Sequence, residues 1–180
     1  MNAHFEQLTA LVTPSARSVP RQDWSEVAEE VGFDLPKDYR KLVDVYGGGC
    51  FDSYLWVLEP RCKNRHFDLL RLIEERDEGF ELLWEDGEPQ PPSMLQNPGS
   101  RVIPWATTDN GEFLYWLADS GMPSESWPVL VNEARGAWWE HFDVGCVEML
   151  VGLLSGEIRS EILSRSFPLP RHTFEEVGRF

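Results

Sequence analysis

The sequence has few basic side chains and no long apolar run. Of its 180 residues, 16 are Lys or Arg and 31 are Asp or Glu, which gives a formal net charge of −15. Phosphate backbones and anionic lipids repel such a chain, so we expect no binding to nucleic acid or to a membrane surface unless its few cations gather in one place. No stretch approaches the roughly 18 consecutive apolar residues of a transmembrane helix. The charge therefore favours a basic protein as the partner.

Cysteine is also scarce. The three cysteines, Cys50, Cys62 and Cys146, are odd in number and widely spaced, so they do not form the disulfide framework of a small secreted domain. Residues 1–11 lack the basic start and the long apolar core of a secretory signal or a membrane anchor. We expect a cytoplasmic protein whose thiols stay reduced.

The sequence contains no nucleotide-binding or nucleophile motif. Gly47-Gly48-Gly49 follows an expected helix and lacks the remaining residues of a phosphate loop, which indicates a helix stop or a tight turn. Ser155 is preceded by Leu153 where a nucleophile elbow requires glycine. Adjacent helical carboxylates such as Glu74 and Glu75 do not face each other, so they do not share an acid–base site. We assign no catalytic residue and no cofactor.

Four side chains are of types that bind zinc: Cys50, Cys62, His66 and Cys146. Structural zinc ligands usually come in close pairs, and here only Cys62 and His66 are near each other. Buried, reduced thiols are the favoured interpretation, and no metal site is assigned. His141, in an expected strand, is either a half-buried structural residue or, with a carboxylate partner, a general base.

Apolar and aromatic residues, in contrast, are plentiful. They make up 42% of the chain and include eight Trp, ten Phe and four Tyr, which is too hydrophobic for a disordered acidic tail. A chain of this length suits one compact domain that buries most of its surface. We expect a folded globular protein.

Apolar residues recur at helical spacing in five segments: 4–12, 23–32, 36–46, 66–84 and 143–156. Asp23 is expected to cap the second helix and Gly32 to end it. Pro36 suits the first position of the third helix, because its missing N–H would be unpaired there. Asp143 is expected to cap the last helix and Gly156 to end it.

Between these helices lie short runs typical of strands, beginning with 50–58. Residues 101–107 and 112–118 flank Asp109-Asn110-Gly111, whose Asn-Gly pair suits a hairpin turn. Residues 127–133 and 137–142 form a second hairpin around Arg135-Gly136. Hairpins make the sheet mainly antiparallel, so the predicted fold class is α+β, with helices packed on the sheet.

The negative charge is concentrated in one segment. Residues 74–88 contain eight carboxylates and one Arg, and they continue into a proline-rich loop. Such a run is usually a solvated helix face; the functional alternative is an acidic docking surface, which gains support from the charge of the whole chain.

The tryptophans fall into two groups. Trp24, Trp105 and Trp116 lie in apolar patterns and are expected in the core. Trp138 and Trp139 are neighbours on an expected strand and point to opposite faces, so one of them can be an exposed interface anchor. The candidate partner-binding residues are Glu74, Glu78, Glu81, Trp84, Glu85, Asp86, Glu88, Trp138 and Trp139.

Several motifs in order resemble the SUKH superfamily over about residues 21–156. They are Trp24, Gly32-x-x-Leu35-Pro36-x-x-Tyr39-x-x-Leu42, Tyr46-Gly47-x-Gly49-x-Phe51, Pro104-Trp105, Asp109-Asn110-Gly111-Glu112, Trp116 and Leu150-x-x-Leu153-Leu154-x-Gly156. This domain is shared by fungal cell-wall assembly regulators and many bacterial immunity proteins.

The resemblance implies a single α+β domain without catalytic residues, and bacterial members that are cytoplasmic antidotes to polymorphic toxins, often nucleases or deaminases. We expect an N-terminal helix and connector over 1–20, the SUKH-like domain over 21–163 and a surface tail over 164–180. The acidic helix and proline-rich loop, at about 66–100, depart from the compact family pattern. The family has no fixed toxin-binding motif, so no binding residue is carried over.

Three functions follow as hypotheses. The leading one is an immunity protein that binds and neutralises a cognate toxin. The alternative is a scaffold or regulatory module with an endogenous partner. An enzyme would require a pocket that joins His141 to a carboxylate, or a metal bound by the cysteines.

Overall fold

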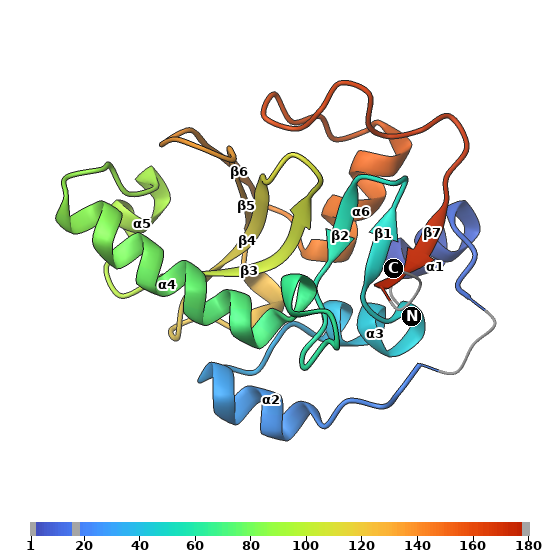
Figure 1. Ribbon diagram of the computed structural model, residues 1–180, viewed down its shortest axis with the longest axis horizontal. Coiled ribbons are helices and arrows are strands. Elements are labelled where there is room, and N and C mark those ends of the chain that lie inside the picture. The colour runs from blue at the N-terminus through green and yellow to red at the C-terminus, as the bar shows by residue number, and fades with distance from the viewer. Residues whose placement is uncertain (1–2, 16–18, 178–180) are drawn as a thin grey trace.

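The computed structural model describes residues 3–15 and 19–177 (Figure 1). The helices are α1 (Ala3–Leu11), α2 (Trp24–Val31), α3 (Lys37–Tyr46), α4 (Leu69–Glu85), α5 (Pro92–Gln96) and α6 (Cys146–Ser155). The strands are β1 (Gly49–Phe51), β2 (Leu55–Val57), β3 (Arg101–Thr108), β4 (Phe113–Ala118), β5 (Val129–Asn132), β6 (Trp139–Phe142) and β7 (Phe174–Glu176). Within the described residues these strands form one antiparallel sheet in the order β6-β5-β4-β3-β2-β1-β7. The predicted α+β fold is confirmed.

Helices cover both faces of this sheet. Along β4, Leu114 and Trp116 belong to the main core, to which α1, α2, α3, α6 and the first part of α4 contribute. Tyr115 and Leu117 belong to a second cluster that includes Phe80 of α4. Successive side chains of a strand point to opposite faces, so a strand covered on both sides must be apolar throughout. This explains the uninterrupted apolar run of β4.

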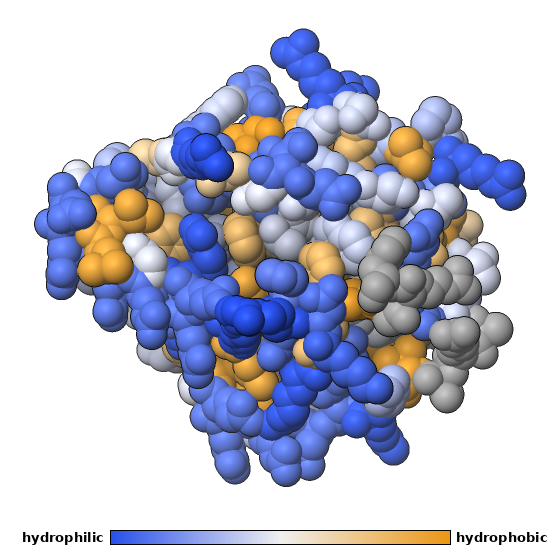
Figure 2. Space-filling view, in the orientation of Figure 1, coloured by the Kyte–Doolittle hydropathy of each residue, from blue (hydrophilic) through white to orange (hydrophobic). Residues whose placement is uncertain are grey.

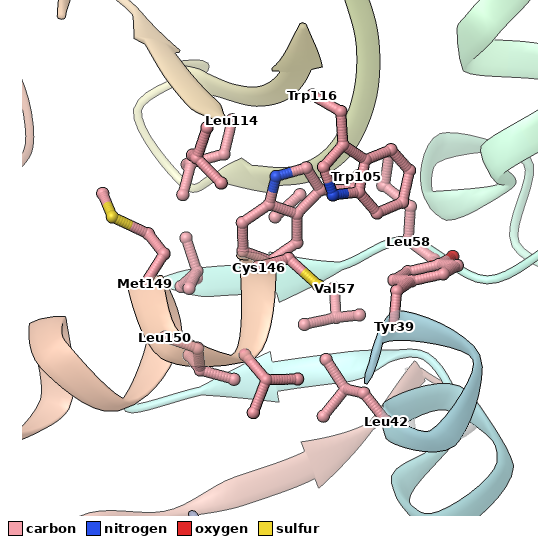
Figure 3. Close-up of a cluster of buried hydrophobic side chains, with 14 of the residues drawn as sticks. Tyr39, Leu42, Val57, Leu58, Trp105, Leu114, Trp116, Cys146, Met149 and Leu150 are labelled. Atoms are coloured by element: carbon pink, nitrogen blue, oxygen red, sulfur yellow. The ribbon is translucent and has the colours of Figure 1, made fainter. Parts of the chain in front are cut away.

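Two tryptophans occupy the centre of the main core (Figure 3). Trp105 of β3 and Trp116 of β4 are fully buried, with ring centroids 6.2 Å apart. Tyr39 of α3 meets Trp116 edge-on at 4.8 Å, and its hydroxyl donates a hydrogen bond to the Leu58 carbonyl at 2.6 Å. Cys146 of α6 lies beside the two indoles. The expected core positions of Trp105 and Trp116 are confirmed.

The helix α2 begins and ends where the sequence predicts. The Asp23 carboxylate accepts hydrogen bonds from the backbone N–H groups of Ser25 and Glu26, and Gly32 ends the helix in the left-handed region, with φ 85°. Trp24 lies at the edge of the core rather than inside it. Its ring is half-buried, and its indole N–H donates to Asp44 at 3.0 Å.

The start of α6 differs from the prediction. Asp143 does not cap this helix; the helix begins after Gly145, and the side chain that reaches its first turn is Asp38 of α3. The Asp38 Oδ2 atom accepts a hydrogen bond from the Val147 N–H at 3.1 Å. A Cβ atom at Gly145 would lie 3.0 Å from that oxygen, so glycine leaves room for the incoming carboxylate. The prediction failed because the cap comes from 109 residues away.

The run 50–58 is a hairpin rather than one strand. It contains β1 and β2, which turn at Asp52 and Ser53, both with φ in the left-handed region. Asp52 is buried and accepts hydrogen bonds from the N–H groups of Leu169 and Thr173, at 3.0 and 2.8 Å, and lies 2.8 Å from His172 Nδ1. The turn therefore holds the C-terminal part of the chain.

Residues 164–177 do not form the expected surface tail. Residues 174–176 form β7, which pairs with β1 at the edge of the sheet. The Phe174 ring packs on Tyr46 and Phe51 at centroid distances of 5.1 and 4.8 Å, and Val177 is buried. The remaining residues, 178–180, lie outside the described part of the chain.

The N-terminal helix likewise joins the main core. Phe5 and Leu8 of α1 are buried there, and the Tyr46 hydroxyl donates to the Val12 carbonyl at 2.6 Å. The expected domain limits, 21–163, stay a prediction, although the segments on both sides of them pack on this core. Among the described residues, none of the helices combines the length and the apolar character needed to cross a membrane.

The position of the α6 cap leads to a stability prediction. Asp38→Ala removes the acceptor of the Val147 N–H and should lower the free energy of unfolding by about 1 kcal/mol, the usual cost of losing a helix cap. Asp143→Ala is the control, because its side chain is 92% exposed and should change stability by less than about 0.5 kcal/mol. Urea unfolding measures both. A larger loss of stability in Asp143→Ala than in Asp38→Ala would mean that Asp143 caps α6 after all.

Candidate functional site

The acidic segment forms a helix that is anchored along one side. Asp68 caps α4 by accepting a hydrogen bond from the Leu70 N–H at 3.2 Å. The buried residues of the helix are Leu69, Leu72, Ile73 and Phe80. Its 17 residues extend over about 25 Å, and Figure 1 shows the helix running across the sheet to the left end of the molecule. Its opposite side is left facing solvent.

Two arginines hold α4 in place. Arg101 of β3 forms an ion pair with Asp77 and donates to the Val31 carbonyl at 3.1 Å, which ties the helix to β3 and to the end of α2. Arg76 donates from Nε to the Tyr115 hydroxyl at 3.0 Å and lies 4.8 Å from the centre of the Phe80 ring. These contacts make α4 a fixed part of the fold.

Four glutamates line the solvent side of α4. Glu74, Glu78, Glu81 and Glu85 follow the spacing i, i+4, i+7, i+11, which places them on one face of a helix, and all four are exposed. We call them the acidic stripe. No ion pair involves any of the four among the described residues, whereas the nearby Glu75 is paired with Arg71. The stripe is therefore a row of uncompensated charge.

Further charge and apolar surface lie at the end of the helix. Asp86 and Glu88 follow the stripe and are exposed. Leu82 is 66% exposed, and Leu83 and Leu95 are 42% and 65% exposed. Figure 2 shows an apolar patch surrounded by hydrophilic residues at the left end of the molecule, where α4 ends and α5 lies. An exposed apolar patch that is surrounded by charged residues is typical of a protein-binding surface.

The candidate tryptophans separate into two places. Trp84 of α4 stacks on Phe80 of the same helix at 5.0 Å, and Trp139 of β6 packs 5.7 Å from Phe80 and 5.4 Å from Tyr115, so Trp139 supports α4 from the sheet side. Trp138 is 46% exposed and borders a hollow with Leu153 of α6, which belongs to the main core. The structure thus gathers Trp84 and Trp139 around the buried Phe80, whereas the stripe lies on the solvent side of α4 and Trp138 lies apart. The contribution of each to binding stays a prediction.

The groups considered for catalysis have other contacts. His141 Nε2 lies 2.8 Å from Asp143 Oδ1, but the two side chains are 37% and 92% exposed, so the pair stands on the open surface. The Ser155 hydroxyl donates to the Gly152 carbonyl at the end of α6. The Gly48 N–H donates to the Glu59 carboxylate at 3.0 Å, so the glycine segment holds an anion of the chain itself.

The three thiols are not gathered at one point. Cys146 belongs to the main core, whereas Cys50 and Cys62 belong to a separate cluster with Trp56. No group of three His, Cys, Asp or Glu residues within 3–15 and 19–177 has the geometry to hold a metal ion. Burial raises the pKa of all three thiols, that of Cys50 to about 12.

Comparison with known proteins gives one match. The model of the family SUKH_6, described as SMI1-KNR4 cell-wall, matches residues 21–142. The matched segment includes α4, α5 and both central hairpins. Neither the curated proteins nor the solved structures that were compared with the chain gave a match.

Charge repulsion within the acidic stripe leads to a second prediction. Glu78 and Glu81 have only acidic or neutral neighbours one turn away, and the acidic residues at the end of α4 oppose the helix dipole. Glu78→Gln and Glu81→Gln should each raise the free energy of unfolding by about 0.3 kcal/mol at low salt. Glu75→Gln, which breaks the pair with Arg71, is the control and should not raise it. Denaturant unfolding at low and high salt measures these effects, and equal changes in all three variants would contradict the prediction.

The buried thiols lead to a prediction about pH. Above the thiol pKa of the unfolded chain, about 8.5, the unfolded state loses protons that the folded state keeps, so stability must fall as pH rises. The slope should reach about 1.4 kcal/mol per pH unit for each buried thiol. Cys50→Ala should make the decline between pH 9 and pH 10 shallower, as measured by urea unfolding, with no change in slope between pH 6 and pH 7. An unchanged slope at high pH would show that this thiol ionises in the folded protein.

Proposed function

The chain belongs to the SUKH family, and we propose that it is an immunity protein that neutralises a cognate protein toxin by binding it. SUKH domains are in general non-catalytic immunity or regulatory modules. The observation that carries the proposal is the acidic stripe: four exposed glutamates, none of them in an ion pair among the described residues, on a helix fixed to the sheet. The partner is a toxin with a basic surface, and a nuclease, whose cleft must attract phosphate, fits this chemistry.

The stripe acts in two stages of binding. Its field accelerates the encounter with a basic surface and orients the two proteins. Once they meet, the fixed helix loses little conformational freedom, because Arg101 and Arg76 already hold it. Ion pairs with the toxin also relieve the repulsion among Glu74, Glu78, Glu81 and Glu85.

Apolar contacts supply the rest of the affinity. Exposed charges alone contribute little once solvated, whereas apolar side chains that become buried at the centre of an interface contribute most. Leu82 and Leu83 lie beside the stripe at the end of α4, and Leu95 is on α5. We infer that these leucines contact an apolar part of the toxin while the glutamates surround them.

The site of action is the cytoplasm. The three cysteines are free, which suits the reducing environment of that compartment. This proposal is consistent with an antidote that protects the cell in which it is made.

The test expresses the protein together with any toxin-like protein that is encoded beside its gene. Co-expression should restore growth, and the purified complex should weaken as salt rises. Glu78→Lys with Glu81→Lys and Glu85→Lys should lower the affinity more than about tenfold and abolish rescue. The control changes three exposed carboxylates elsewhere, Glu6→Lys, Asp34→Lys and Glu157→Lys, and should keep the rescue, because the net charge is the same.

Three results would count against parts of the proposal. Equal loss in both triple variants would mean that total charge rather than the stripe determines binding. If the affinity of the complex did not change with salt concentration, the electrostatic part of the proposal would be wrong. A stable partner in cells that lack any toxin gene, with no rescue by the protein, would favour a regulatory module instead.

A further inference from the structure

A second surface lies on the other side of β6 from α4. It is a groove of about 1080 Å³ between Trp138 and the segment 156–168, which Figure 1 shows looping over the top of the molecule. We call it the Trp138 groove. Ile158, Leu163 and Phe167 provide its apolar lining, and Trp138 forms one wall. Its size suits a short stretch of extended peptide or a few side chains.

Hydrogen bonds hold the segment that lines the groove. The Ser160 hydroxyl accepts from the N–H groups of Ile162 and Leu163, both at 3.1 Å, and donates to the Glu140 carboxylate of β6. Further along the chain, the Ser164 N–H donates a hydrogen bond to the buried Tyr54 hydroxyl at 2.9 Å. The segment is thus attached both to β6 and to the core, so the groove exists before any ligand arrives.

Trp138 is exposed on a fixed backbone. Its N–H donates to a Glu133 carboxylate oxygen at 2.9 Å, and its carbonyl accepts from Asn132 Nδ2 at 3.0 Å and from the Glu133 N–H at 3.2 Å. Trp138 is 46% exposed, and the exposed part of a large aromatic side chain is unfavourably solvated until a partner covers it. An indole in this position is typical of a binding anchor.

The lining of the groove includes two arginines and one glutamate, in a protein that is acidic overall. Arg159 and Arg165 are exposed at its border, and neither forms an ion pair among the described residues, while Glu161 is the one carboxylate in the lining. Other exposed arginines, such as Arg21 and Arg65, also have no ion pair among the described residues, so the feature particular to Arg159 and Arg165 is their place beside an apolar hollow. Two free guanidinium groups beside an apolar groove therefore favour an anionic ligand with an apolar part.

We propose that the Trp138 groove binds an extended, acidic segment of a partner protein. An aromatic or aliphatic side chain of that segment enters between Trp138 and Phe167, and its carboxylates pair with Arg159 and Arg165. Charge complementarity selects this occupant, because a basic segment would meet two arginines and a neutral one would leave them unpaired. The groove uses no residue of α4, so the inference stands independently of the proposed toxin contact.

The test uses short fluorescein-labelled peptides and the full-length protein. The first peptide has Phe-Leu at its centre and Asp and Glu on both sides; the second has Lys at every acidic position. Fluorescence anisotropy should show saturable one-site binding of the acidic peptide and none of the basic one. Arg159→Glu with Arg165→Glu should weaken binding more than about tenfold, and Trp138→Ala should do the same.

A matched charge control is available. Arg21→Glu with Arg65→Glu makes the same change in net charge at two exposed arginines outside the groove and should alter the affinity less than about twofold. Circular dichroism checks that each variant is folded, and Arg159→Gln with Arg165→Gln replaces the Glu pair if that variant unfolds. Sedimentation at increasing concentration tests a second copy of the chain as the occupant.

Any of four results overturns the proposal. The acidic peptide shows no saturable binding, the basic peptide binds equally well, the two arginine double variants lose affinity for the acidic peptide equally, or the protein self-associates in a way that Arg159→Glu with Arg165→Glu abolishes.

The α4 variant Glu78→Lys with Glu81→Lys separates the two proposed surfaces. It should leave peptide binding intact even where it prevents toxin neutralisation, so either proposal can fail alone.

Discussion

The need to satisfy two buried tyrosine hydroxyls on α3 organises this fold. Tyr39 and Tyr46 are fully buried and lie two helical turns apart, and each donates a hydrogen bond of 2.6 Å, to the carbonyls of Leu58 and Val12 respectively. Burial raises the pKa of both, so they remain neutral donors. An unsatisfied buried hydroxyl is costly, and these bonds therefore fix α3 against the end of β2 and against the N-terminal segment. With α3 in place, Asp38 reaches α6, and the helix layer beneath the sheet is complete.

The sheet then separates two surfaces of different character, the acidic stripe and a groove bordered by two arginines. Trp139 points toward Phe80 and supports α4 with its acidic stripe, whereas Trp138, one residue earlier, borders the groove with Arg159 and Arg165. Neighbouring residues of an extended chain point to opposite sides, so one dipeptide contributes to both surfaces. A protein with this arrangement can hold a basic surface on one side and an acidic segment on the other. The same rigid layer of strands keeps the two apart.

Local signals in the sequence were sufficient for much of the fold. The cap at Asp23 and the glycine stops at Gly32 and Gly156 act over a few residues, and each appears in the structure as predicted. The hairpin at Asn110-Gly111 also forms, although only Gly111 has a positive φ, so the turn is not of the type I′ that an Asn-Gly pair favours. The position of the acidic stripe also follows from helical spacing alone. Contacts between distant segments were not predictable in this way. Asp38 rather than Asp143 caps α6, and residues 174–176 join the sheet because a buried Asp52 holds the preceding segment.

The sequence by itself determined the charge, the fold class, the ends of most helices and the row of glutamates, because these depend on composition and on neighbours within one or two turns. Only the tertiary structure decided that Trp84 and Trp139 face inward and that Trp138 faces outward. Only the tertiary structure, likewise, decided that Arg159 and Arg165 share a groove. The physical reason is that burial and charge pairing are set by which segments meet. In this chain such contacts join residues more than a hundred positions apart in the sequence, such as Tyr54 with Ser164 and Asp52 with Thr173.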